Sequence, residues 1–123
     1  DFQANKIPFA VQHPFPKDEK LLAVGKYLLT NIDKNYTIEE IAKHFGLSVR
    51  SLSRKFKDHM GMNYVRFLRS LRITKALELI AENKYNMLEI ALLVGYSSVS
   101  SFSNIFLKIT GLRPTDYAKL VKK

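Results

Sequence analysis

A chain of 123 residues, 46% of them apolar, can bury one hydrophobic core or two small ones and is expected to be globular. Its 20 Lys and Arg against 11 Asp and Glu give a formal charge of +9, which favours a polyanionic partner, either nucleic acid or an anionic membrane. The absence of Cys excludes a disulfide framework, a thiol nucleophile and a zinc site built on Cys, and no apolar run approaches the roughly 20 residues needed to span a bilayer. We therefore expect a soluble, cytoplasmic protein.

Residues 1–16 come before the first helical pattern, and they contain Pro and Phe with little net charge. The first residue is Asp1 rather than an initiator Met, so we expect the chain to be the C-terminal part of a longer protein. We interpret residues 1–16 as an interdomain linker or as the remnant of a missing N-terminal domain.

The first two helices have clear boundary signals. The first is expected over about 17–30, followed by a loop over 31–36. Thr37 and Glu40 then form a capping box, in which each side chain accepts a hydrogen bond from the backbone amide of the other. This box predicts the start of a second helix, which ends at Gly46.

The next two helices begin at polar caps. Ser48 is the predicted N-cap of a third helix that runs to Met60, with Gly61 as its stop. Asn63 then caps the longest helix of the chain, which is expected over 64–82.

Three further helices complete the chain. Asn86, with Glu89 three residues later, caps the fifth helix, and either Ser97 or Ser98 caps the sixth. Pro114 suits the first position of a seventh helix. No segment has a convincing strand pattern, so the predicted fold class is all-α with seven helices.

The two halves of the chain carry the same pattern, offset by 49 or 50 residues. The first copy is Ile41-Ala42-x-x-x-Gly46 followed by Ser51-Leu52-Ser53-Arg54-x-Phe56-x-x-x-x-Gly61, and the second is Ile90-Ala91-x-x-x-Gly95 followed by Ser101-Phe102-Ser103-Asn104-x-Phe106-x-x-x-x-Gly111. A small residue lets two helices cross closely, and the Gly four residues later ends the first helix in a left-handed conformation. Each copy predicts a helix-turn-helix, the usual device for placing a helix in the DNA major groove. Two copies predict a reader of two successive grooves.

The third helix has two contrasting faces. The apolar face, expected to point inward, comprises Val49, Leu52, Phe56 and Met60. The other face follows the i, i+3, i+4, i+7 rule and comprises Arg50, Ser53, Arg54 and Lys57. An Arg fork can donate twice to guanine, which is worth about 1 to 3 kcal/mol of discrimination. The alternative, a merely solvated charged face, is less favoured because this face has no acid and belongs to the second helix of a helix-turn-helix.

The sixth helix has an outer face without charge. Its inward side chains are predicted to be Phe102, Phe106 and Ile109, and its outer ones are Ser100, Ser103, Asn104 and Leu107, with Val99 at the tip. Asn can pair twice with adenine, Ser bonds to several bases, and an apolar side chain can touch a thymine methyl. A helix that touches DNA without reading it remains an equal alternative.

The helix over 64–82 joins the two units. Its 19 residues span about 28 Å at 1.5 Å each, close to the roughly 34 Å between successive major grooves on one face of a duplex. From Val49 to Lys75 the charge is almost entirely positive: Arg50, Arg54, Lys55, Lys57, Arg66, Arg69, Arg72 and Lys75 stand against Asp58. Arg72 lies in an apolar stretch and is expected to pair with an acid if it does not meet DNA. The predicted phosphate contacts are Ser48, Lys57, Arg66, Arg69, Ser97, Ser98 and Lys108.

From about Asp18 to Tyr117 the sequence resembles the DNA-binding domain of the AraC/XylS family of bacterial transcription regulators. In the first half the resemblance is carried by Ser51-Leu52-Ser53-Arg54-Lys55-Phe56-Lys57-x-x-x-Gly61 and Arg72-Ile73-x-x-Ala76-x-x-Leu79-Ile80. In the second half it is carried by Ile90-Ala91-x-x-x-Gly95-Tyr96, Phe102-Ser103 and Gly111-Leu112-Arg113-Pro114-x-x-Tyr117. As a set, these motifs are highly specific.

The resemblance implies two helix-turn-helix subdomains, over 17–62 and 84–123, joined by a connecting helix over 63–83. It implies base contacts from both recognition helices, at Arg50, Ser53, Arg54, Val99, Ser100, Ser103 and Asn104. The sequence departs from the family pattern at Tyr64, where Pro is frequent, at Asn104, where Arg is common, and at Leu107, where Lys is common. The expected partners are double-stranded DNA, RNA polymerase and an N-terminal effector-sensing or dimerisation domain of the same protein.

Two other classes of function are alternatives, an enzyme and a membrane-surface or protein-interaction module. An enzyme or a metal site is not expected, because His13, His44 and His59 lack the i, i+4 spacing of metal ligands and the Ser residues of the second unit have no His and acid nearby. No cofactor is expected either. A membrane-surface or protein-interaction module is the stronger alternative, since the helix over 64–82 is basic and amphipathic. The duplicated turn argues against it, because membrane binding does not require one.

Overall fold

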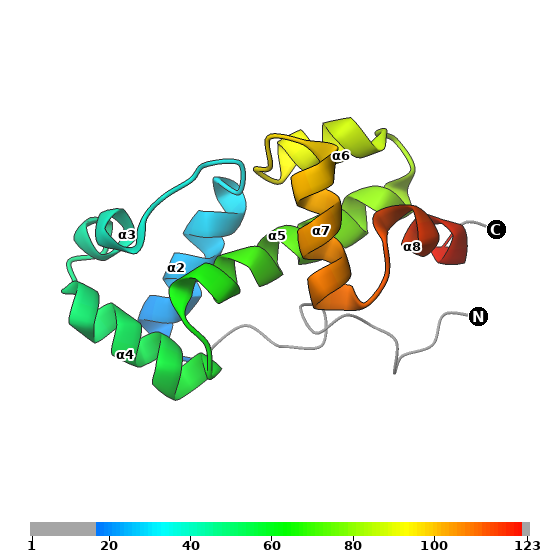
Figure 1. The fold of residues 1–123 in the computed structure, drawn as a ribbon. Helices are drawn as coiled ribbons and strands as arrows, with labels where there is room; N and C mark the ends of the chain where they lie inside the picture. The colour runs from blue at the N-terminus through cyan, green and yellow to red at the C-terminus, as the bar shows by residue number, and fades with distance from the viewer. Residues whose placement is uncertain (1–16, 122–123) are drawn as a thin grey trace.

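The computed structural model of the protein describes residues 17–121, which form seven α-helices and contain no strand (Figure 1). The helices are α2 (Glu19–Thr30), α3 (Ile38–His44), α4 (Val49–Met60), α5 (Tyr64–Glu82), α6 (Met87–Leu93), α7 (Val99–Thr110) and α8 (Pro114–Val121). The predicted all-α class with seven helices is confirmed. The segment 1–16, predicted as an interdomain linker or as the remnant of a missing N-terminal domain, lies outside the described residues.

The same local chemistry starts the first helix of each helix-turn-helix. At α3 the Thr37 amide donates to Glu40 Oε1 at 2.8 Å, and the Glu40 amide donates to Thr37 Oγ1 at 3.1 Å. At α6 the Asn86 amide donates to Glu89 Oε1 at 2.9 Å, and the Glu89 amide donates to Asn86 Oδ1 at 2.8 Å. Both predicted capping boxes are therefore confirmed, and they satisfy backbone amides that the helix itself leaves unpaired.

The two turns also use the same backbone conformation. Gly46 has φ +68° and Gly95 has φ +100°, so both lie in the left-handed region that favours Gly. Each turn brings the chain from a seven-residue helix into a twelve-residue helix, α3 into α4 and α6 into α7. The repeat found in the sequence is therefore a repeat of the structure.

The protein has two hydrophobic cores, and α5 passes through both. In Figure 1, α2, α3 and α4 gather around the first half of α5, while α6, α7 and α8 gather around its second half. Phe67 and Leu71 of α5 belong to the first core, and Ile73 and Ala76 belong to the second. The change from one core to the other therefore falls at Arg72.

Some predicted details need correction. The first helix begins at Glu19, not at Lys17, because the Asp18 side chain accepts from the Leu21 amide at 3.0 Å and makes Asp18 the N-cap. Val49 was predicted to point inward but is 37% exposed, because the first residue of α4 precedes the turn that meets the core. Met60 and Ile109, near the ends of α4 and α7, are only half-buried.

Candidate nucleic-acid interface

Helix α4 is fixed to the first core by one face and exposes the other. The Ser48 hydroxyl caps it by accepting from the Ser51 amide at 3.0 Å, and Leu52 and Phe56 are completely buried beneath it. The four side chains of the predicted outward face, Arg50, Ser53, Arg54 and Lys57, are all exposed. The structure thus presents a polar, positive helix face without an acid in its first turn.

Helix α7 occupies the equivalent place in the second unit. Ser98, rather than Ser97, is its N-cap and accepts from the Ser101 amide at 3.1 Å, while Phe102 and Phe106 are completely buried. On the outer face Val99 is 39% exposed, and Ser97, Ser100 and Asn104 are exposed. Ser103 and Leu107 are half-buried, so this face presents less polar surface than that of α4.

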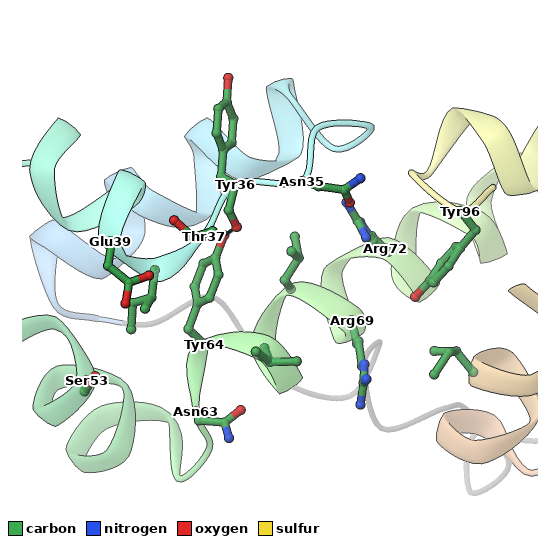
Figure 2. A pocket seen from close by; sticks show the side chains of 14 residues that line it. Asn35, Tyr36, Thr37, Glu39, Ser53, Asn63, Tyr64, Arg69, Arg72 and Tyr96 are labelled. Atoms are coloured by element: carbon green, nitrogen blue, oxygen red, sulfur yellow. Dashed lines mark hydrogen bonds between the residues drawn. The ribbon is translucent and has the colours of Figure 1, made fainter. Parts of the chain in front are cut away.

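A hollow of about 660 Å³ lies between the two units (Figure 2). Ser53 of α4 and Ile105 of α7 lie on its two sides, and between them it is lined by Asn63, the N-cap of α5, and by Val65 and Arg69 of that helix. Both recognition helices therefore border one concave surface, which contains the first half of α5.

A second hollow of about 430 Å³ adjoins the first. It brings together Arg66 and Arg69 of α5 and Lys108 of α7, three of the predicted phosphate contacts, and no acid lines it. The two hollows share Asn63, Val65, Arg69 and Ile105, so they form one continuous depression. We call this combined surface the central groove.

Among the cations counted from Val49 to Lys75, Lys55, Arg72 and Lys75 contact groups of the protein itself. Lys55 donates to Asp18 Oδ2 at 2.8 Å, and Lys75 lies 3.9 Å from Glu78 Oε1. Arg72 is buried, and its guanidinium donates to two backbone carbonyls and an amide oxygen. The expectation that Arg72 pairs with an acid is therefore wrong, because two backbone carbonyls and the Asn35 side chain, all in the loop before α3, accept its hydrogen bonds. Arg50, Arg54, Lys57, Arg66 and Arg69 are all exposed.

Sequence reasoning missed the apolar members of the central groove. Val65 is 52% exposed and Ile105 is half-buried, and the sequence patterns assign no role to either residue. A signal was present in the sequence, because Val65 and Arg69 are four residues apart on one helix and must share a face. For Ile105 there was none, since its contact with α5 depends on how α7 crosses that helix.

Tyr64, which departs from the family pattern, is well accommodated. Its hydroxyl donates to the Tyr36 carbonyl at 2.7 Å, and its ring meets the Phe56 ring edge-on with centroids 5.9 Å apart. Burial raises the pKa of Tyr64 to about 12, so the hydroxyl remains a donor at neutral pH. Tyr64 therefore ties the start of α5 both to the loop before α3 and to α4.

Residues 17–121 contain no group of three His, Cys, Asp or Glu side chains placed to hold a metal ion. Nor does this part of the chain include a helix with the length and apolar character that crossing a membrane requires.

A paired helix-turn-helix whose two recognition helices border one groove defines a class of DNA-binding domain, and comparison with known proteins identifies the family. Residues 41–120 match the family model described as a helix-turn-helix domain. The transcriptional regulatory protein HptR of Staphylococcus aureus is 36% identical over 86 residues, which cover 70% of this chain and 34% of that protein. The HTH-type transcriptional activator RhaS of Salmonella arizonae is 31% identical over 99 residues, 80% of this chain and 36% of that protein.

Among solved structures, a transcriptional regulator from Chromobacterium violaceum, described as AraC-type, has a TM-score of 0.80 and 25% identity. The match covers 85% of this chain and 93% of that one. The chain belongs to this helix-turn-helix family and is an AraC-type DNA-binding domain. It spans about a third of the length of the curated relatives that it matches.

Proposed function

We propose that this protein binds double-stranded DNA sequence-specifically, with α4 and α7 in successive major grooves on one face of the duplex, and thereby regulates the initiation of bacterial transcription. The observation that carries the proposal is that both recognition helices border the same central groove. The 19 residues of α5 span about 28 Å, near the roughly 34 Å that separates such grooves.

The proposed base contacts come from the exposed faces of the two recognition helices. In α4, Arg50 and Arg54 offer guanidinium forks to guanine, and Ser53 lies between them on the same face. In α7 the corresponding side chains are Val99, Ser100, Ser103 and Asn104. Only Asn104 among these can form a two-bond pair with a base edge, and adenine is its partner.

The proposed phosphate contacts surround these readers. Arg66, Arg69 and Lys108 line the second hollow of the central groove, where the backbone of the minor groove between the two reading sites would pass. Ser48, Ser97 and Ser98 lie at the N-terminal ends of the recognition helices, where hydroxyl groups and the helix dipole favour a phosphate. Lys57, the last of the proposed phosphate contacts, lies C-terminal to the base-contacting residues of α4.

The remaining features of the proposal concern the whole protein. We propose subdomain limits at 17–62, 63–83 and 84–123, an N-terminal effector-sensing or dimerisation domain in the same protein, and contact with RNA polymerase. This proposal is supported by the similarity to HptR, a transcriptional regulatory protein, and RhaS, a transcriptional activator, since the chain covers only 34% and 36% of these proteins. We further propose that the protein is not an enzyme and that it acts in the cytoplasm, where bacterial DNA is located.

The proposal can be tested by selecting bound duplexes from a random library and footprinting the selected site. Interference by methylation of guanine N7 should fall in two major grooves one helical turn apart. A variant with Arg50→Ala and Arg54→Ala should lose the selected site but keep weak binding to random duplex, since its phosphate contacts are intact. Equal affinity for every sequence would overturn sequence-specific reading.

The alternative of a membrane surface is tested beside it. Sedimentation with anionic vesicles is compared with gel shift on random duplex at the same salt concentration. We expect the protein to shift the duplex and not to sediment with the vesicles. Binding to vesicles alone would establish the alternative.

A further inference from the structure

Arg72 occupies the point at which α5 leaves one core and enters the other. Leu71 packs in the first core and Ile73 in the second, and Arg72 between them is only 7% exposed. A buried guanidinium is costly unless its donors are satisfied. The groups that accept hydrogen bonds from the Arg72 guanidinium therefore indicate the role of this residue.

On one side, Arg72 holds the loop before α3. Its Nε donates to the Ile32 carbonyl at 3.2 Å, and its Nη2 donates to the Lys34 carbonyl at 2.8 Å and to Asn35 Oδ1 at 2.9 Å. Tyr36, the next residue of this loop, accepts from the Tyr64 hydroxyl. The loop is thus fixed from two positions of α5, eight residues apart.

On the other side, Arg72 holds the turn of the second helix-turn-helix. Its Cζ lies 5.5 Å from the centre of the Tyr96 ring, and Figure 2 shows the guanidinium between Asn35 and Tyr96. The side chain also fills the space beside Gly95, where an added Cβ would lie 2.6 Å from Cζ. One side chain therefore contacts both units at once.

These contacts continue to the recognition helices. Tyr96 packs against Phe102 of α7, with ring centroids 5.9 Å apart. Tyr64 packs against Phe56 of α4, also at 5.9 Å. Phe102 and Phe56 are each completely buried beneath the recognition face of their own helix, although they occupy different positions of the repeat, where Phe102 corresponds to Leu52 and Phe56 to Phe106. Arg72 is therefore linked through one aromatic contact to α7, and through the loop and Tyr64 to α4.

The chemistry of Arg suits this place better than that of any other cation. A planar guanidinium can donate in its plane to carbonyls while its face stacks on an aromatic ring, whereas a Lys ammonium is a point charge that cannot do both. The partners of Arg72 are neutral, and burial lowers its pKa, yet Arg stays protonated at neutral pH. The arrangement is one of directional contacts, not of charge pairing.

We propose that Arg72 is a positioning residue that fixes the rotation of the two helix-turn-helix units about α5, and so determines which spacing of half-sites the protein accepts. The inference rests on the proposed function, since it assumes that both units read DNA. Because α5 is continuous, it already fixes the separation of the units along its axis; the contacts of Arg72 resist bending and twisting between them.

The first test measures affinity for the selected site with its natural spacing and with one base pair inserted or removed between the half-sites. One base pair rotates the second half-site by about 34°, so a rigid protein should bind the altered sites poorly. In Arg72→Lys the preference for the natural spacing should shrink by about three- to tenfold, because the units can turn to follow either site. An unchanged preference in a folded variant would overturn the proposal.

Two matched controls separate positioning from loss of charge. Arg69→Ala removes an exposed cation one turn earlier on α5 and should weaken binding to all spacings alike. At the aromatic partner, Tyr96→Leu should relax the spacing preference, whereas Tyr96→Phe should keep it. Phe keeps the aromatic ring that Arg72 contacts and removes only the hydroxyl. Equal effects of Leu and Phe would contradict the role of the ring.

A second test does not depend on DNA. The chain contains no Cys, so spin labels can be placed at Lys43→Cys on α3 and Asp116→Cys on α8, both exposed. The distance distribution between the labels should be narrow in the parent protein and broader in Arg72→Lys and Tyr96→Leu, with melting curves confirming that each is folded. A narrow distribution in both variants would overturn the proposal. If the distributions broaden but no duplex is bound, the proposed function fails while the role of Arg72 in positioning stands.

Discussion

The Asp18 carboxylate and the Lys55 ammonium lie 2.8 Å apart, although 37 residues separate them, and this ion pair joins the start of α2 to the middle of the recognition helix α4. The same carboxylate caps α2 by accepting from the Leu21 amide, and it lies 3.6 Å from His59 Nε2. The Asp18 side chain is only 15% exposed. The Asp18 carboxylate therefore caps α2 and also binds α4, on the side opposite the outward face of that helix.

The two roles of Asp18 can be separated by substitution. Asp18→Ala removes both the cap and the ion pair and should lower the free energy of unfolding by about 1 to 2 kcal/mol. Asp18→Asn keeps a capping oxygen and should cost less. Urea unfolding of both variants measures the difference, and Asp58→Ala, an exposed acid on α4, is the control, with an expected change below about 0.5 kcal/mol. Equal losses for Ala and Asn would show that the ion pair, not the cap, supplies the stability.

The stability contributed by Asp18 should also depend on pH. The hydrogen bond from Lys55, and then that from the Leu21 amide, lower the pKa of Asp18 below its ordinary value of 3.8. A carboxyl group with a lowered pKa in the folded protein stabilises it above the unfolded pKa, and this stabilisation is lost as the pH falls through the folded pKa. The difference in unfolding free energy between the parent protein and Asp18→Asn should therefore narrow as the pH falls below about 4. A difference that stays the same down to pH 2 would contradict this cause.

The helices could be predicted closely because their boundary signals are local. Asn63 and the limits of α5 at Tyr64 and Glu82 agree with the structure, and so do both capping boxes. Each signal is a side chain that bonds to a backbone group within three residues, so no knowledge of the fold is needed to find it. The prediction that Val49 points inward was wrong because helical periodicity does not indicate whether the first residue of a helix contacts the core.

The partners of the cations could not be predicted in the same way. Lys55 and Arg72 look like their neighbours Arg54 and Arg69 in the sequence, but their partners lie 37 to 40 residues away. Which cation becomes buried depends on how α2 and the loop before α3 pack against α4 and α5. The outward faces of α4 and α7 were found from periodicity, whereas the central groove follows from the crossing of α5 and α7.

Two lysines of α4 offer a matched test of the electrostatic contribution to DNA binding. Lys57 is exposed, whereas Lys55 is paired with Asp18. The logarithm of the binding constant should fall with the logarithm of salt concentration by about 0.9 for each phosphate neutralised. Lys57→Ala should make this slope shallower by about one and weaken binding to all sequences alike, while Lys55→Ala should leave the slope unchanged. Titrations from low to moderate salt measure the slopes of both variants. A changed base preference in Lys57→Ala would instead show that Lys57 contacts a base.

The two recognition helices are expected to contribute unequally to specificity. Arg54 and Asn104 occupy the same position of the repeat and both are exposed, but the first helix also has Arg50, whereas the second has only Val99, Ser100 and the half-buried Ser103 beside its Asn. Loss of an Arg fork from guanine should cost about 1 to 3 kcal/mol and relax one position of the site. Loss of a Ser contact that water can replace should cost less. Arg54→Ala should therefore reduce specific binding more than Ser103→Ala or Asn104→Ala.

Affinity for the selected site and for every single-base change in both half-sites, at one salt concentration, measures this asymmetry. Thermal melting is the control, since an outward Arg54 should leave stability nearly unchanged when it is replaced. Asn104→Arg supplies the reverse experiment, because it gives the second helix the fork that it lacks and should increase discrimination in that half-site. If Asn104→Ala were instead the most damaging change, the second helix would be the primary reader through an Asn and adenine pair, and the cations of α4 would contribute affinity alone.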